Sequence, residues 1–238
     1  MAKSSPLQVT VLPATQADCL TLAQIESIAF HSTSNHNNGN NSSADDSGRP
    51  STLARVMFGP PTAEGHAFRA KDLAEKMQTD PSLRVFKAVV NVDARKEEQH
   101  KIVAWAGWHY YFDPQPIEEW QDKEWPGSWS PQACNDFFGT IARKRNQYMG
   151  EKRYALLEVL VTLPAYQGLG IGSRLLQAGL DQAADQHGLS DAWLEASVEG
   201  YALYRKFGFR DVDEILMDLT RYGGTGSTRH VCMLRSAD

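Results

Sequence analysis

Residues 160–176 constrain the fold of this chain more than any other stretch. They read Leu-Val-Thr-Leu-Pro-Ala-Tyr-Gln-Gly-Leu-Gly-Ile-Gly-Ser-Arg-Leu-Leu, a pattern that predicts a strand, a glycine-rich turn and the start of a helix. Glycines let successive backbone N–H groups face one point, and the helix dipole adds positive potential there. The stretch therefore predicts an anion site that suits a pyrophosphate.

Two well-known phosphate-binding motifs do not fit this stretch. A dinucleotide-binding fold needs G-x-G-x-x-G, whereas the glycines here stand at 168, 170 and 172. Glu195 lies at an acceptable distance for the acidic residue of that motif, but too little chain follows Gly172 for a doubly wound sheet. A P-loop requires Gly-Lys-Ser/Thr, and Arg174 stands where the lysine would be needed.

The remaining pattern predicts alternating strands and helices in one domain, residues 1–238. The polar segment 31–52 cannot bury enough apolar surface to order itself, so we expect a mobile insertion there. Residues 113–130, rich in Trp and Pro, are too irregular for a regular element and are expected to line a pocket. We expect strands at 9–12, 83–92, 101–112, 154–163, 192–196, 213–220 and 229–235, and helices at about 18–29, 62–78, 131–149, 170–187 and 199–207.

Composition excludes several classes of protein. The chain has 24 Lys and Arg against 29 Asp and Glu, a formal net charge of -5, which argues against a nucleic-acid partner. No stretch approaches the ~20 apolar residues that cross a bilayer, and no secretory signal is evident. Cys19, Cys134 and Cys232 are odd in number and far apart, so we expect a reducing compartment, the cytoplasm, and no metal site.

The glycine-rich stretch resembles the signature of the GNAT superfamily, the acyl-CoA-dependent N-acetyltransferases. The family pattern Gln/Arg-x-x-Gly-x-Gly/Ala is met at every fixed position by residues 167–172. Residues 201–209, Tyr-Ala-Leu-Tyr-Arg-Lys-Phe-Gly-Phe, resemble the family's Leu-Tyr-x-x-x-Gly-Phe. Ser197 and Gly200 depart from the Asn and Ala that the family often has before this tyrosine. The resemblance is specific over about 155–210 and weaker over 9–112.

The resemblance implies an α+β fold and acetyl-CoA as co-substrate. It implies a central, mostly antiparallel, twisted sheet of six to seven strands with a splayed parallel pair, flanked by helices. Backbone groups of a strand edge would pair with the pantetheine arm, and an amide near Thr162 would polarise the thioester carbonyl. The implied cofactor-binding residues are Leu160, Val161 and Thr162 on the strand and Gln167, Gly168, Leu169, Gly170, Ile171, Gly172 and Ser173 in the turn.

The resemblance also implies the catalytic residues. Tyr204 would protonate the departing thiolate, or would merely pack on its helix. Glu158 and Glu195 are the candidate bases; the alternatives are a structural ion pair of Glu158 with Arg153 or another cation, and a solvated charge at Glu195. We expect His109 to be a packed, hydrogen-bonded histidine rather than a catalytic one.

The function expected is acetyl transfer from acetyl-CoA to a primary amine of a small molecule, by direct attack in a ternary complex. A protein or peptide acceptor, or a non-catalytic acyl-CoA sensor with the same site, are the alternatives. The enzyme would be a monomer or a homodimer. An acceptor pocket, or equally a core, would include the tryptophans Trp105, Trp108, Trp120, Trp125 and Trp129.

Overall fold

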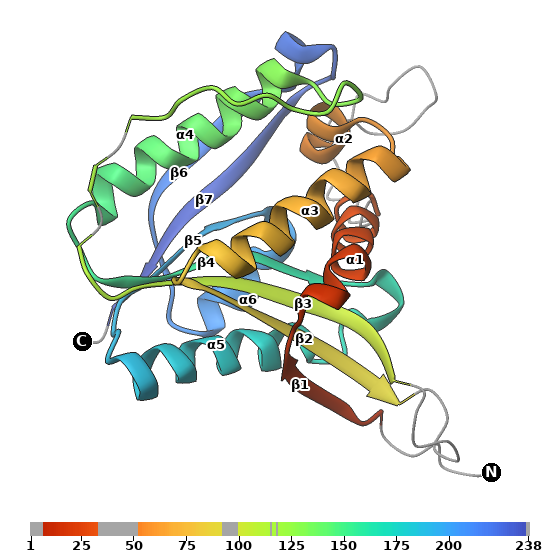
Figure 1. The fold of residues 1–238 in the computed structure, drawn as a ribbon. Coiled ribbons are helices and arrows are strands. Elements are labelled where there is room, and N and C mark those ends of the chain that lie inside the picture. The colour runs from red at the N-terminus through yellow and green to blue at the C-terminus, as the bar shows by residue number, and fades with distance from the viewer. Residues whose placement is uncertain (1–6, 33–51, 92–99, 115, 118, 237–238) are drawn as a thin grey trace.

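A seven-stranded sheet forms the centre of the molecule (Figure 1). The computed structural model describes residues 7–32, 52–91, 100–114, 116–117 and 119–236. The strand order is β1-β2-β3-β4-β5-β7-β6, and only the pair β4–β5 is parallel, so the predicted fold class is confirmed. The strands are β1 Val9–Pro13, β2 Leu83–Asn91, β3 His100–Tyr111, β4 Tyr154–Thr162, β5 Ala192–Ala196, β6 Arg210–Asp218 and β7 Ser227–Arg235.

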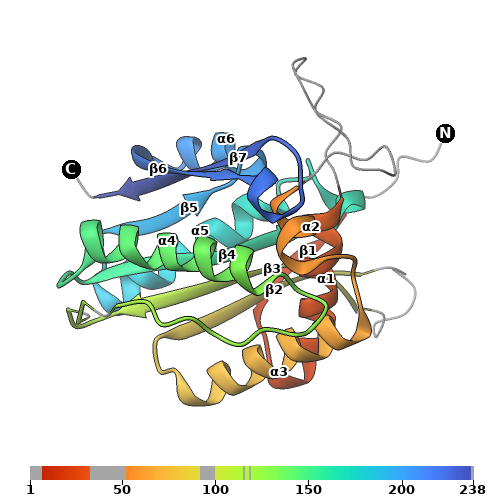
Figure 2. The same ribbon diagram turned by 90° about the horizontal axis from the view of Figure 1, so that it is seen from above.

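Helices cover both faces of the sheet (Figures 1 and 2). One face carries α1 (Cys19–His31), α2 (Leu53–Phe58), α3 (Ala63–Thr79) and α4 (Pro131–Met149), and the other carries α5 (Ile171–His187) and α6 (Val198–Lys206). The predicted starts of two helices rest on side-chain caps. Thr62 accepts from the Gly65 N–H, and Ser130 accepts from the Ala133 N–H with proline at the first helical position. None of the helices in the described ranges is long and apolar enough to cross a membrane.

The apolar core differs between the two faces. On the α5 side one cluster extends across the sheet and includes Trp108, Leu175 and Leu194. On the opposite side the core is split: Trp105 packs with residues of α1 and α3, whereas Trp193 packs with residues of α2 and α4. The gap between these two clusters is where buried and half-buried polar side chains of β3, β4 and α3 gather.

A β-bulge in β4 separates its two halves. Residues Ala155–Leu157 pair with both β3 and β5, but the pairing with β5 ends there. In the ladder with β3, Gly107 pairs with Val159 and Trp108 with Leu157, so Glu158 is the extra residue. A bulge bends its strand and leaves the extra residue unpaired. From Glu158 to Thr162 the edge of β4 that faces β5 is therefore open within the described structure.

Two expectations differ from the structure, and a third lies mostly outside the described residues. The short helix α2 was not predicted, because its 6 residues give less than two turns of periodicity; Thr52 caps it and Met57 is buried. Strand β6 begins at Arg210, three residues before the expected start. Most of the expected insertion, residues 33–51, lies outside the described residues, and His31 belongs to the end of α1.

The first prediction follows from the close packing of α5 on β3. A Cβ at Gly179 would lie 2.2 Å from Nε1 of the fully buried Trp108. We expect Gly179→Ala to lower the free energy of unfolding by about 3 kcal/mol, as overpacking does in tight cores. Gly127→Ala is the control, since a Cβ there meets nothing within 4 Å. Urea denaturation measures both, and equal losses would contradict the account.

Candidate active site

The glycine-rich turn presents a row of free amide groups. Gly168 and Gly170 have φ values of +74° and +77°, which non-glycine residues rarely adopt. Among the described residues no group of the protein accepts a hydrogen bond from the backbone N–H of residues 168–173. A Cβ at either glycine would meet nothing within 4 Å, so the turn borders open space. Unpaired amides at a helix N-terminus form an anion site.

Gln167 contributes differently from the expectation. Its backbone N–H already donates to the Pro164 carbonyl at 3.2 Å, so the row of free amides starts at Gly168. Its side-chain amide donates to the Thr162 carbonyl at 3.0 Å and ties the turn to the end of β4. Arg174 reaches the Val9 carbonyl of β1 at 3.2 Å. The structure places Leu160, Val161 and Thr162 on the open edge of β4. The side chain of Val161 is buried, so a ligand at this edge would contact its backbone groups only.

Glu158 lies at the bulge with part of its side chain accessible (29%). His109 Nε2 is 3.5 Å from Glu158 Oε2, and no ion pair with Arg153 forms: Arg153 donates instead to the His187 carbonyl. Burial alone would raise the pKa of Glu158. The hydrogen bond from His109 and the charges of Lys76, His109 and Arg69 outweigh it and hold this pKa well below the ordinary value.

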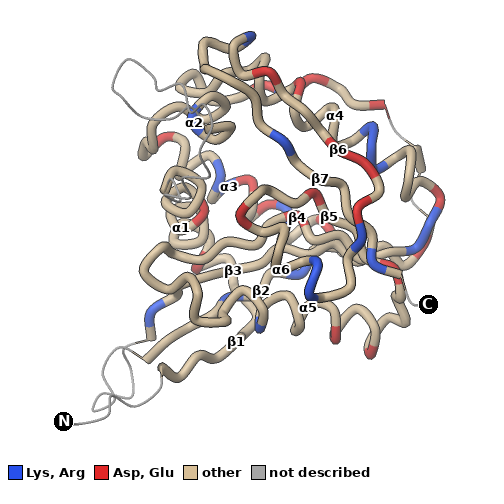
Figure 3. Tube along the Cα trace, turned by 180° about the vertical axis from the view of Figure 1, so that it is seen from behind, with Lys and Arg blue, Asp and Glu red and all other residues tan. Residues whose placement is uncertain are grey.

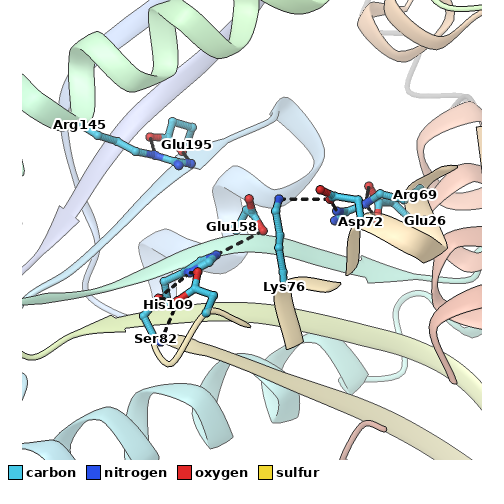
Figure 4. Close-up of polar contacts among 10 residues, drawn as sticks. Glu26, Arg69, Asp72, Lys76, Ser82, His109, Arg145, Glu158 and Glu195 are labelled. Carbon is cyan, nitrogen blue, oxygen red and sulfur yellow. Dashed lines mark hydrogen bonds and ion pairs between the residues drawn. The ribbon is translucent and has the colours of Figure 1, made fainter. Parts of the chain in front are cut away.

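Glu195 is a buried, ion-paired carboxylate rather than a solvated one. Its side chain is 5% exposed. Arg145 of α4 donates to both its oxygens, at 2.9 and 2.7 Å, and the Trp193 indole donates to Oε1 at 2.6 Å. Figure 4 shows the two glutamates apart, Glu195 directed to Arg145 and Glu158 to His109. The structure therefore does not bring both candidate bases to one point.

Tyr204 is buried on α6, on the α5 side of the sheet. Its ring packs edge-on against Phe209 at a centroid distance of 6.1 Å. A Cβ at Gly200 would lie 2.6 Å from Tyr204 Cε2, so the glycine that departs from the family pattern makes room for this ring. Burial raises the pKa of Tyr204, which keeps its hydroxyl protonated and able to donate.

A network of charges around Glu158 was not found from the sequence. Arg69 on α3 binds Glu26 of α1 at 3.1 Å and Asp72 at 2.9 Å, and Lys76 binds Asp72 at 3.2 Å (Figure 4). The spacing of residues 69, 72 and 76 places them on one face of α3, but charges on a helix usually indicate a solvated face.

Elsewhere, Figure 3 shows basic and acidic residues interspersed along the trace.

The tryptophans divide between core and surface hollow. Trp105 and Trp108 lie in the core on opposite faces of β3, which rules them out as an acceptor pocket. Trp125 and Trp129 stack at 5.8 Å. Trp129 also lines a hollow of about 50 Å³ together with Glu26 and other residues of α1 and α3. Within the described ranges no cluster of three or more His, Cys, Asp or Glu could hold a metal ion.

Comparison with known families agrees with this geometry. Residues 94–209 match the model of the acetyltransferase (GNAT) family, a span that includes the bulge at Glu158, the free amides and Tyr204. The chain carries a GNAT acetyltransferase domain. It is an acyltransferase, and the GNAT family takes its acetyl group from acetyl-CoA. The free amides and the open strand edge fit that co-substrate.

Solved structures share the fold of this GNAT domain at low sequence identity. A histone acetyltransferase HPA2 and related acetyltransferase from Corynebacterium glutamicum has 20% identity and a TM-score of 0.54, covering 97% of each chain. A mosquito arylalkylamine N-acetyltransferase like 5b has 13% identity and a TM-score of 0.58, covering 97% of this chain and 100% of its own. The ribosomal-protein-S18-alanine N-acetyltransferase from Escherichia coli has 15% identity and a TM-score of 0.50, covering 96% and 94%. No curated protein matches the chain in sequence.

The second prediction concerns the ion pair between Arg145 and Glu195. Removing one partner of a buried pair leaves an uncompensated charge, so Arg145→Ala should lower the free energy of unfolding by about 3 kcal/mol. Arg143→Ala on the same helix is the control, because Arg143 is exposed and bonds only the Thr140 hydroxyl. Thermal and urea unfolding measure the difference. A loss no greater than that of the control would show that the pair does not stabilise β5.

Proposed function

We propose that the protein transfers an acetyl group from acetyl-CoA to a primary amine of a small molecule, by direct attack in a ternary complex. The observation that carries this proposal is the row of unpaired amides from Gly168 to Ser173 beside the open edge of β4. Three free, buried cysteines support a reducing, cytoplasmic setting, in which the enzyme acts as a monomer or a homodimer.

The amides bind the diphosphate and the strand edge binds the pantetheine arm. Backbone N–H groups at a helix N-terminus attract phosphate oxygens without any lysine or arginine. The groups of Leu160, Val161 and Thr162 that face β5 have no strand partner, so an extended arm can pair with them as an added strand would. Gln167 supports the turn through its side chain.

Proton transfers accompany the attack at both ends. An aliphatic ammonium has a pKa near ~10.4 and must lose its proton, which Glu158 accepts directly or through water. An amide near Thr162 polarises the thioester carbonyl. Tyr204 then protonates the leaving thiolate, whose thiol has a pKa near ~8.5. In this proposal Glu158 is the base, and Glu195, held by Arg145, keeps β5 in place.

The small-molecule acceptor is supported by the surroundings of Glu158. The carboxylate lies between the α3 and α4 sides of one sheet face, where a slender amine has better access than a folded protein surface. Relatives of the same fold are named for a histone, an arylalkylamine and a ribosomal protein, so the fold does not select the acceptor. A protein or peptide acceptor is therefore the second candidate, and a non-catalytic sensor the third.

Two measurements test the proposal. Calorimetric titration with coenzyme A tests the amide site, and lack of binding would refute every candidate. An amine panel that includes small amines and lysine peptides, read by thiol release and mass spectrometry, then identifies the acceptor class. Binding without any turnover would indicate the sensor.

Gly170→Asp is the third prediction. The new carboxylate would stand in the anion site, so we expect the affinity for coenzyme A to fall at least about tenfold, or about 1.4 kcal/mol. Gly170→Asn is the matched control, because asparagine has the same shape, tolerates positive φ and carries no charge. Calorimetry compares the two variants. Equal affinities would mean that no anion binds at this turn.

Tyr204→Phe is the fourth prediction. Without the hydroxyl the thiolate must leave unprotonated, so kcat should fall on the order of 100-fold while the affinity for acetyl-CoA stays the same. The ring keeps its packing on Phe209 and above Gly200, so stability should change little. Steady-state kinetics with the best amine of the panel measures the effect. Unaltered kcat would remove the acid role.

A further inference from the structure

His109 is a buried polar side chain in contact with the candidate base Glu158. It lies on β3, directly beside the bulge that carries Glu158, and its side chain is 7% exposed. Its ring stacks on Tyr111 at a centroid distance of 5.8 Å. Packing alone does not explain why an imidazole rather than an apolar side chain occupies this position, because both its nitrogens face polar partners.

Each ring nitrogen of His109 faces a carboxylate. Nε2 is 3.5 Å from Glu158 Oε2, and Nδ1 is 3.3 Å from Asp80 Oδ2. Nδ1 is also 2.9 Å from the Ser82 hydroxyl oxygen. Asp80 has 32% of its side chain exposed. The imidazole thus links two accessible carboxylates through the interior, as the close-up in Figure 4 shows for Glu158 and Ser82.

The turn between α3 and β2 fixes the orientation of the ring. Ser82 donates both its hydroxyl and its backbone N–H to Asp80 Oδ1, at 2.6 and 2.8 Å. Because the Ser82 proton is directed to Asp80, its oxygen accepts from His109 Nδ1–H. In the neutral ring the lone pair therefore lies on Nε2 and faces Glu158, and only the protonated ring donates from Nε2–H to the carboxylate, the hydrogen bond that lowers the pKa of Glu158. The Tyr110 N–H donates to the Ser82 carbonyl at 2.9 Å and locks this turn against β3.

We propose that His109 is the final acceptor of the proton that the amine loses, with Glu158 as the connecting group and Asp80 as the anion that stabilises the imidazolium. This inference rests on the proposed function. His109 does not touch the acceptor, so it is a positioning residue for the base. As in a catalytic triad, one ring nitrogen faces the group that delivers the proton, and the other faces a carboxylate that orients the ring.

The proton is conserved through the cycle. The ammonium gives a proton to a Glu158 oxygen, and the same oxygen passes it to His109 Nε2. The amine lone pair then forms the C–N bond, the nitrogen of the adduct gives its second proton to water as the C–S bond breaks, and the thiolate takes a proton from Tyr204. After release of products, Nε2 returns its proton through Glu158 to water, and water reprotonates Tyr204, so no ring rotation is needed.

The surroundings of Glu158 support a second proton acceptor beside it. The charges of Lys76 and Arg69 favour its carboxylate form, so it attracts an ammonium but retains a proton poorly. An imidazole beside the Asp80 carboxylate can hold that proton as an imidazolium. The titratable and charged groups that surround the pair, from every packed element, are Glu26, Arg69, Lys76, Asp80, Tyr111 and Arg145.

A titration of the ring tests the geometry without any acceptor. NMR of the full chain follows the protonation of the His109 ring with pH in the unaltered protein and in Asp80→Asn. Removing the anion beside Nδ1–H should move the midpoint to lower pH, because the imidazolium loses its stabilising charge. Ser190→Ala serves as a control far from the ring and should leave the midpoint unchanged. An unchanged midpoint in Asp80→Asn would overturn the proposal.

Kinetics tests the role, with 2-phenylethylamine as the probe and the best panel amine beside it. In the unaltered protein kcat should rise with pH through one ionisation, and Asp80→Asn should move that rise to lower pH in step with the ring. His109→Gln keeps the bulk and a hydrogen bond to Ser82, yet it should lower kcat at least about tenfold and abolish the ionisation. His187→Gln, on the α5 side, should retain both.

The outcomes separate this inference from the proposed function. If His109→Gln keeps the pH profile and kcat of the unaltered protein while Glu158→Gln is slow, the role of His109 is wrong and the acetylation stands. If the unaltered protein binds coenzyme A but acetylates no amine, the proposed function fails and this role fails with it.

Discussion

The site depends on one irregularity in the sheet, the bulge at Glu158. In a regular β4, pairing with β5 (Ala192–Ala196) could continue for two more residues, to Val159, and would use those backbone groups within the protein. The extra residue bends the strand, so pairing with β5 stops at Leu157 and the following edge opens. Side-chain alternation from Leu156, which packs in the cluster under α4, places Glu158 on the face that carries α3 and α4. The candidate base and the open edge of β4 therefore lie next to each other along the chain.

Polar pairs hold the split face of the sheet together. The apolar clusters under α3 and α4 do not join, and the space between them contains His109, Glu158 and the pairs Arg69–Glu26 and Arg145–Glu195. Buried pairs add little net stability compared with apolar packing, but each is costly to break. Their value here is geometric, because Arg69 ties α1 to α3 and Arg145 ties α4 to β5 while the centre stays polar enough for a carboxylate.

The sequence predicts features that neighbouring residues determine. It does not predict features that depend on how distant strands align with each other. The free amides after Gly168 follow from glycine spacing and a helix start, which neighbouring residues determine. The bulge could not be predicted, because it depends on how Gly107 and Trp108 align with a strand about 50 residues later. The structure confirms that His109 is packed and hydrogen-bonded, but its partner Asp80 could not be predicted, because it comes from a turn that the sequence does not place beside the strand. Helix α2 was too short to give a periodic signal.

In the proposed reaction, the candidate acid and base would approach the thioester from opposite faces of the sheet. Tyr204 belongs to the apolar cluster on the α5 side, whereas Glu158 lies on the side of α3 and α4. Only where β4 and β5 part can a group between them be reached from both sides. In the proposed reaction an amine that arrives past Glu158 would attack one side of the carbonyl carbon while the sulfur leaves toward Tyr204. The separation would keep the phenol protonated in its apolar surroundings while the carboxylate and imidazole take the amine's proton, so each end of the proposed reaction has its own electrostatic environment.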